Sequence, residues 1–285
     1  MAKPRAGRIL ARPMRVPVLT YHANNVGGND YANNDHVALA ADLRAIHRAG
    51  LRIVPLSRVV DALLGEADDS TVEGAVALSF DDGSWFDWHD IDHPSCGPQR
   101  GFAGILRDFA TETGAAVHAT SFVIVSPEAR TILDRTCLVG RGWWTDEWWP
   151  AAEREGLIAI ESHSWDHNHA TLPVTAQRDQ AKGTFRTIDT YADADAEIRQ
   201  ANDWLDAHCR VPRGGLFAYP YGEINAYLVD DYLPHRTAEH RLRAAFATAQ
   251  RPVEKTSNRW TLPRSVCGDH WRSPHEFARL LDELT

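Results

Sequence analysis

Three short polar segments of this 285-residue chain carry the side chains that could do chemistry. Each follows or ends an apolar run, and they are SFDDG at residues 79–83, SHSWDHNH at residues 162–169 and AYPYG at residues 218–222. Asp81 and Asp82 are adjacent carboxylates, which repel each other unless a cation or a proton relieves them. His163 and His167 lie four positions apart, close enough on a helical turn for both imidazoles to bind one ion. One carboxylate and two imidazoles therefore predict a metal site.

The donor set of Asp82, His163 and His167 leaves at least one coordination position for water. A divalent cation can acidify that water towards neutral pH and turn it into a nucleophile. Zinc is the favoured ion for nitrogen and oxygen ligands, and cobalt, nickel or manganese would also fit. Two simpler interpretations stay open, namely an ordinary Asp-Asp-Gly turn and a metal-free histidine patch that includes His169.

Strand and helix patterns alternate along the chain and place the polar segments at strand ends. Apolar runs predict strands at residues 16–21, 51–56, 75–80, 116–125, 157–160, 216–219, 243–248 and 261–266. The carboxyl ends of parallel strands form the active-site edge of α/β folds, so we expect the three segments to meet there. Roughly seven or eight βα units would suit a barrel or an open doubly wound sheet, and periodicity leaves this choice open.

Serine residues mark the expected starts of several helices. Ser57 is a candidate N-cap, and Ser-Pro at 126–127 combines a cap with a first-turn proline. Ser-Pro at 273–274, followed by Glu276, is expected to form a capping box for the last helix. Residues 193–208 carry apolar side chains on one face and predict a further helix.

Composition and charge limit the class of protein. With 44% hydrophobic and 24% charged residues, the chain is expected to fold as one domain over residues 16–285, after a basic tail at residues 1–15. The net charge of −9 argues against nucleic acid and anionic membranes as partners. The chain contains no apolar core of a secretory signal and no membrane-spanning run, which favours a cytoplasmic protein, while export stays open for a trimmed chain. The sequence does not indicate an oligomeric state.

A structural role is the first interpretation of the cysteine and tryptophan residues. The cysteines are Cys96, Cys137, Cys209 and Cys267, and they lack CxxC spacing. Buried free thiols are expected, with two disulfides as the alternative in an exported chain. Four of the ten tryptophans crowd residues 143–149. They could stack on sugar rings, but burial is the usual role of tryptophan, and we expect Trp148 and Trp149 to anchor a helix.

Together the three polar segments resemble the polysaccharide deacetylase family, also called NodB-homology or carbohydrate esterase family 4 proteins. The similarity covers most of the chain, and VLTYH at residues 18–22 is similar to the start of such domains. The resemblance implies a distorted (β/α) barrel of about seven strands in a single domain. It also implies that Asp81 is the catalytic base and that Asp82, His163 and His167 bind the metal.

The third segment departs from the family pattern. The family has RxPYG where this chain has AYPYG, so Ala218 replaces the arginine that steadies the base, as in relatives resembling poly-N-acetylglucosamine deacetylases. Tyr221 matches the residue whose backbone N–H helps to stabilise the oxyanion. Arg264 is a candidate for orienting Asp81, by its position alone, with a structural salt bridge as the alternative.

The general acid must also come from a different position, because the family's LxxH motif is missing. His270 follows the expected strand at 261–266 and is the first candidate for this role. A solvent-exposed loop histidine is the alternative interpretation of His270. His22 and His169 are then the remaining candidates for the acid.

The resemblance implies a metal-dependent hydrolase that removes N-acetyl groups from an N-acetylated carbohydrate. Metal-activated water would attack the amide carbonyl, Asp81 would accept the proton and His270 would protonate the departing amine. Hydrolysis of a small non-glycan amide, such as a cyclic imide or ureide, is one alternative. A catalytically inactive carbohydrate-binding protein is the other.

Overall fold

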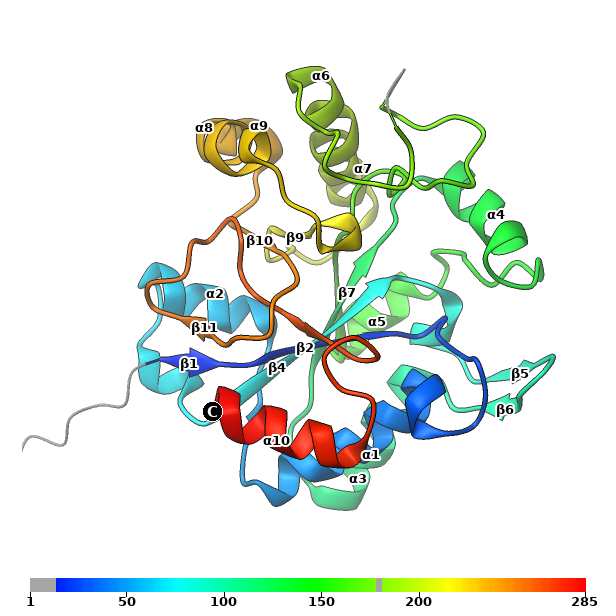
Figure 1. Cartoon of the computed structure of the whole chain (residues 1–285), viewed down its shortest axis with the longest axis vertical. Coiled ribbons are helices and arrows are strands. Elements are labelled where there is room, and N and C mark those ends of the chain that lie inside the picture. Colours follow the sequence, from blue (N-terminus) through cyan, green and yellow to red (C-terminus); the bar gives the residue numbers. More distant parts are fainter. Residues whose placement is uncertain (1–13, 178–180) are drawn as a thin grey trace, which may run out of the picture.

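A curled parallel sheet forms the centre of the computed structural model, which describes residues 14–177 and 181–285 (Figure 1). Seven strands follow the order β10–β9–β8–β7–β4–β2–β12, and β3 pairs with the start of β4. The strands are β2 (Val18–His22), β3 (Arg52–Ile53), β4 (Ala75–Asp82), β7 (Ala119–Val123), β8 (Ile158–Ser162), β9 (Leu216–Ala218), β10 (Ala244–Phe246) and β12 (Ser265–Val266). The expected α/β architecture of about seven strands is confirmed.

The two edges of the sheet meet in an irregular way, which makes it a distorted barrel. β12 pairs with β2, while the segment just before β12 reaches the opposite edge. There Leu262 forms a parallel bridge with Phe246, and the N–H of Ala249 donates to the carbonyl of Arg264 at 2.9 Å. The choice between barrel and open sheet, which periodicity left open, is thereby decided in favour of the barrel.

Helices cover the outside of the sheet. They are α1 (Asp35–Arg48), α2 (Leu56–Leu64), α3 (Phe102–Thr113), α4 (Pro127–Thr136), α5 (Trp149–Glu155), α6 (Tyr191–Ala194), α7 (Gln200–His208), α8 (Leu233–His235), α9 (Thr237–His240) and α10 (Pro274–Leu284). Figure 1 shows α1, α3 and α10 together on one side of the sheet, where α1 contacts both of the others. None of the helices within the described residues is both long and apolar enough to cross a membrane.

Side chains of β4 enter two separate apolar cores because they alternate between the faces of the strand. Leu78 and Phe80 pack in the cluster formed with α1, α3 and α10. Ala77 belongs to the second cluster, which includes Phe122 and Phe246 and is closed by α2. Every residue of β4 is buried, so the strand presents its last residues, Asp81 and Asp82, from a rigid support.

Several element boundaries differ from the sequence predictions. The strand expected at 51–56 is only two residues long, because Leu56 already begins α2 with Pro55 as its N-cap, so Ser57 is not the cap. The strand expected at 261–266 is reduced to β12. The helix expected at 193–208 contains a π-helical turn at Asp195–Arg199 between α6 and α7.

Other local predictions are confirmed. The Ser126 side chain accepts a hydrogen bond from the N–H of Ala129, and that of Ser273 accepts one from Glu276. The reciprocal bond of the expected capping box is shifted, because the Glu276 carboxylate accepts from Arg272 rather than from the cap residue. Two small antiparallel pairs were not expected, namely β1 (Arg15–Val16) with β11 (Val253–Glu254) and β5 (Ile91–His93) with β6 (Gly97–Gln99).

The prediction that the cysteines are free is confirmed, but the prediction that they are buried holds for Cys267 alone among the four. All four thiols are free. Cys267 is buried, Cys96 and Cys209 are half-buried, and Cys137 is exposed. Most of the expected basic tail, residues 1–13, lies outside the described residues, and Arg15 belongs to β1. Trp148 and Trp149 are buried at the start of α5, as expected.

Candidate active site

The three polar segments meet at the carboxyl edge of the sheet and line one pocket of about 320 Å³. Asp82 ends β4, His163 directly follows β8, and His167 lies in the next turn. Asp82 Oδ1 is 3.8 Å from Nε2 of His163 and 3.8 Å from Nε2 of His167. One ligand atom from each of the three side chains lies within 4.8 Å of the others, as a shared divalent cation requires.

Unusual backbone conformations present the ligands. Asp82 has φ 75° and His167 has φ 65°, values that non-glycine residues rarely adopt. The carbonyl of Asp82 accepts from the Trp144 indole N–H at 3.1 Å, and the N–H of His167 donates to Ser164 Oγ at 2.9 Å. Gly83 has φ 71°, and a Cβ there would lie 2.4 Å from Val123. The surroundings therefore hold these strained residues in place.

The two imidazoles are in the form that a metal needs. His163 Nδ1 lies 2.8 Å from the carbonyl oxygen of Ala218, and because a carbonyl can only accept, this nitrogen carries the proton. Its Nε2 lone pair then faces Asp82. Burial lowers the pKa of His163 and, more strongly, that of His167, which favours the neutral imidazole. The donor set thus fits a divalent cation.

Asp81 is paired with an arginine at the bottom of the same pocket. Nη1 of Arg264 donates to Oδ1 at 2.6 Å, and Nη2 donates to Oδ2 at 2.8 Å. Both side chains are buried. Burial alone would raise the pKa of Asp81, but the Arg264 charge, the neighbouring His163 and the Arg264 hydrogen bonds together outweigh it and hold that pKa below its usual value. Asp81 is therefore ionised at neutral pH, and its Oδ2 lies 3.8 Å from His163 Nε2.

The candidate general acids occupy different places. His22 lines the pocket, and its Nε2 is 4.0 Å from Asp81 Oδ2. His169 also lines the pocket, beside Cys137. His270 is not among the lining residues, because its Nδ1 accepts from the N–H of Val266 within the turn after β12. The structure therefore brings His22 and His169 to the site, and not His270.

Tyr221 forms part of the pocket wall directly after β9. It lies in a 3-10 turn, Pro220–Gly222, with φ 59°. Its ring packs edge-on against His167, with the centroids 4.4 Å apart, and its side chain is 43% exposed. The AYPYG segment thus contacts the candidate metal ligands through the carbonyl of Ala218 and the ring of Tyr221.

Two contributors to the site were missed by the sequence predictions. Nδ2 of Asn24 donates to Asp82 Oδ2 at 3.1 Å. Trp144 was considered for packing or sugar stacking, yet its indole N–H holds the Asp82 carbonyl. Asn24 belongs to no motif, and its position two residues after His22 in the VLTYH segment is the only signal that could have identified it.

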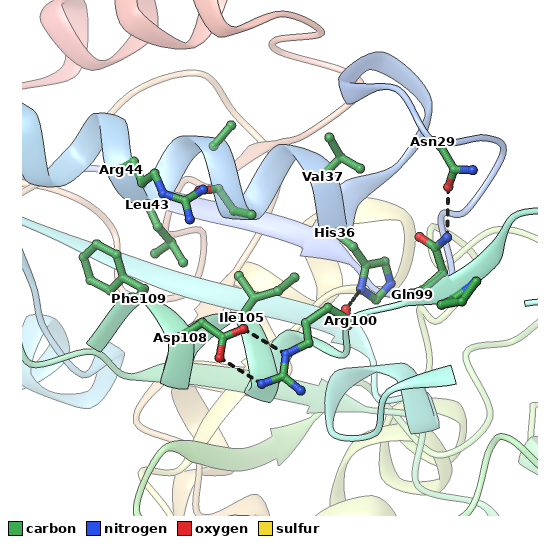
Figure 2. Close-up of a pocket in the computed structure, with 13 residues that line it drawn as sticks. Asn29, His36, Val37, Leu43, Arg44, Gln99, Arg100, Ile105, Asp108 and Phe109 are labelled. Atoms are coloured by element: carbon green, nitrogen blue, oxygen red, sulfur yellow. Dashed lines mark hydrogen bonds and ion pairs between the residues drawn. The ribbon is translucent and has the colours of Figure 1, made fainter. Parts of the chain in front are cut away.

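A second pocket, of about 570 Å³, lies on the outer face between α1 and α3 (Figure 2). Its floor is formed by apolar side chains that include Leu43 and Phe109. Figure 2 shows Arg100 directed at Asp108, and Arg100 Nε donates to the Asp108 carboxylate at 2.9 Å. None of the candidate catalytic or metal-binding residues lines it.

Comparisons with known proteins address the family and the fold of the chain. Residues 68–237, more than half of the chain, match the family described as Polysaccharide deacetylase. No curated protein has a matching sequence.

Solved structures share the fold at low sequence identity. The deacetylase PplD of Streptococcus pyogenes, solved with acetate, has a TM-score of 0.62 and 16% identity, over 96% of this chain and 99% of that chain. A de-N-acetylase from Aggregatibacter actinomycetemcomitans has a TM-score of 0.61 and 14% identity, over 93% of this chain and 99% of that chain. IcaB from Ammonifex degensii has a TM-score of 0.61 and 16% identity, over 95% and 97%. At these identities the similarity establishes the fold.

Proposed function

Because the chain belongs to the polysaccharide deacetylase family, we propose that the pocket at the strand ends is the active site of a metal-dependent carbohydrate de-N-acetylase. Family membership makes the chain a hydrolase of N-acetyl amide bonds. One observation carries the assignment of the site: the ligand set of Asp82, His163 and His167 adjoins an arginine-paired carboxylate, Asp81, in a single pocket.

Asp82, His163 and His167 would hold the metal, with zinc as the first candidate and cobalt, nickel or manganese as alternatives. A divalent cation held there would supply Lewis acidity, which polarises the acetamido carbonyl and acidifies water. The fixed Nδ1 proton of His163 and the strained backbone of Asp82 keep these ligand atoms directed into the pocket. Three protein ligands leave room for the reacting groups.

Asp81 is proposed as the general base. It is ionised and cannot rotate, because the Arg264 fork binds both of its oxygens. Its Oδ2 faces the pocket, within 4.0 Å of Nε2 of His22 and 3.8 Å of Nε2 of His163. Oδ2 would accept the proton of the attacking water as the oxygen bonds to the carbonyl carbon.

The departing nitrogen needs a proton, and the geometry favours His22 as its donor over His270. His22 Nε2 and the base Asp81 lie on the same side of the pocket, whereas the ring of His270 is engaged by its own turn. The backbone N–H of Tyr221 is proposed to donate to the oxyanion that forms on the carbonyl oxygen. The place of Tyr221 supports this role, because its backbone forms a left-handed turn and its ring packs against the proposed metal ligand His167.

The test is acetate release from N-acetylated sugar oligomers and small amides, with and without a chelator. We expect release from the sugars, loss with chelator and recovery on adding zinc. Asp81→Asn should keep the metal and lose roughly 10²- to 10⁴-fold in rate, the range for a general base. Asp82→Ala should lose the metal, as elemental analysis would show.

The same assay separates the alternatives. Ring opening of a cyclic imide or ureide without acetate release from sugars would favour the non-glycan hydrolase. Sugar binding without turnover by the metal-loaded protein would favour a binding protein. Turnover by Asp81→Asn at the wild-type rate would refute Asp81 as the base.

A further inference from the structure

The segment that joins β2 to α1 is clamped by a buried carboxylate. Asp35, the first residue of α1, accepts from the N–H of His22 at 2.8 Å and from the side chain of Asn25 at 2.7 Å. Its own N–H donates to the carbonyl of Asn25 at 3.1 Å. The residues on both sides of Asn24 are therefore fixed against α1, and Asn24 lines the pocket between them.

The orientation of the Asn24 amide is determined by its partner. An ionised carboxylate can only accept hydrogen bonds, so the Asn24 NH₂ group must face Asp82 Oδ2, to which it donates at 3.1 Å. Asn24 Oδ1 is then buried, and residues 14–177 and 181–285 offer it no hydrogen-bond donor. The contact with Asp82 therefore fixes the orientation of this amide.

The two oxygens of Asp82 have different partners. Oδ1 faces the two imidazoles, at 3.8 Å from each Nε2. Oδ2 is turned towards Asn24. We infer that Asn24 is a positioning residue that restricts Asp82 to binding the metal through Oδ1 alone, an inference that rests on the proposed function. A carboxylate bound through one oxygen occupies one coordination position instead of two, which leaves space for substrate and water.

A neutral donor suits this task. Arg264 orients Asp81 and at the same time neutralises its charge. Asn24 orients Asp82 with no formal charge, so the carboxylate keeps its full attraction for a cation. An arginine or lysine at position 24 would instead compete with the metal for Asp82.

The experiment compares Asn24→Leu, which keeps the branching and the number of side-chain heavy atoms and removes the donor, with Asn29→Ala as the control. Asn29 lies in the same segment, and its amide contacts Cys96 and Gln99 away from the pocket. Cobalt is added to the metal-free proteins, and its affinity is measured by competition with a chelator. We expect affinity roughly 10- to 100-fold weaker in Asn24→Leu, the usual effect of losing a partner of a metal ligand, and unchanged affinity in Asn29→Ala.

The visible spectrum of bound cobalt is the second readout, because it reports the number and arrangement of ligands rather than the stability of the fold. A freed Oδ2 would join the metal in Asn24→Leu and change the absorption bands, and Asn24→Ala serves if the leucine variant folds poorly. Wild-type affinity and spectrum in these variants would overturn the inference alone. Failure of the wild-type protein to bind cobalt would overturn the proposed metal site and this inference with it.

Discussion

Asp81 and Asp82 are neighbours in sequence that have opposite electrostatic surroundings. Asp81 is buried against the Arg264 guanidinium, which keeps it ionised. Asp82 turns out of the strand with φ 75°, and its carboxylate faces the Asn24 amide and the imidazoles of His163 and His167. Two adjacent carboxylates can therefore coexist at this strand end, one compensated by an arginine and the other available to a cation.

Removing the arginine should change the pH dependence of catalysis. Burial raises the pKa of Asp81, and Arg264 is the main group that lowers it, so Arg264→Met should raise this pKa. A base with a raised pKa is protonated up to a higher pH, and the acid limb of the kcat/KM profile should move upward. Rates measured across pH 4 to 10 test this, with Arg264→Lys as the control that keeps the charge and loses the fork.

In Arg264→Lys, the upward shift of the acid limb of the kcat/KM profile should be smaller than in Arg264→Met. Metal content by elemental analysis should be unchanged in both variants, because Arg264 contacts no ligand atom of the proposed site. An acid limb at the wild-type pH in Arg264→Met would show that Asp81 does not set it.

At the scale of elements, the features that depend on local sequence were predictable, and those that depend on long-range contacts were not. The apolar run at 75–80 predicts β4 because the strand is buried on both faces, and the serine cap of α4 is a local hydrogen bond. The two-residue β12 has too few residues for a pattern, and its register depends on pairing with β2. The π-helical turn at Asp195–Arg199 likewise has no sequence signature.

The site shows the same division. Asp82, His163 and His167 were recognisable because their types and spacing suit a metal. The contact of Arg264 with Asp81 joins residues 183 positions apart, and strand order decides it. Asn24 acts through a neighbour and belongs to no motif, which is why sequence reasoning passed over it.

Asp42 links three elements and predicts a pH effect on stability. Its carboxylate on α1 accepts from Tyr21 of β2, from Tyr31 and from the Trp271 indole before α10, at 2.9, 2.5 and 3.0 Å. Burial raises the pKa of Asp42 to about 7, with these three hydrogen bonds opposing the rise. The folded protein therefore retains a proton that the unfolded chain releases between about pH 4 and pH 7.

The sign of the effect follows from linkage. A pKa raised by folding contributes stability at low pH, and this contribution is lost as pH rises through about 7. Asp42→Asn has no titrating group, so its free energy of unfolding minus that of wild type should increase between pH 4 and 7 and then level off. Urea unfolding across this range measures the difference. A constant difference would contradict the raised pKa.

At the scale of the whole molecule, the chain brings its two ends together to complete the pocket. β2, near the start, lies between β4 and β12 in the sheet. It carries His22 to the pocket, and the segment just before β12 carries Arg264. The proposed acid and the partner of the proposed base thus both depend on closure of the barrel.

The proposed metal would join β4 to the segment after β8, with β7 between them in the sheet. A ligand that binds only the folded state stabilises it by mass action, by about 2.7 kcal/mol when its free concentration is roughly 100 times Kd. For a chain of this size, we expect the unfolding temperature to fall by roughly 5 to 10 °C on chelation and to recover with zinc. Asp82→Ala should unfold at the same temperature with and without chelator, because it lacks a ligand from β4. Calorimetry of both proteins makes the comparison, and equal chelator sensitivity would place the metal elsewhere.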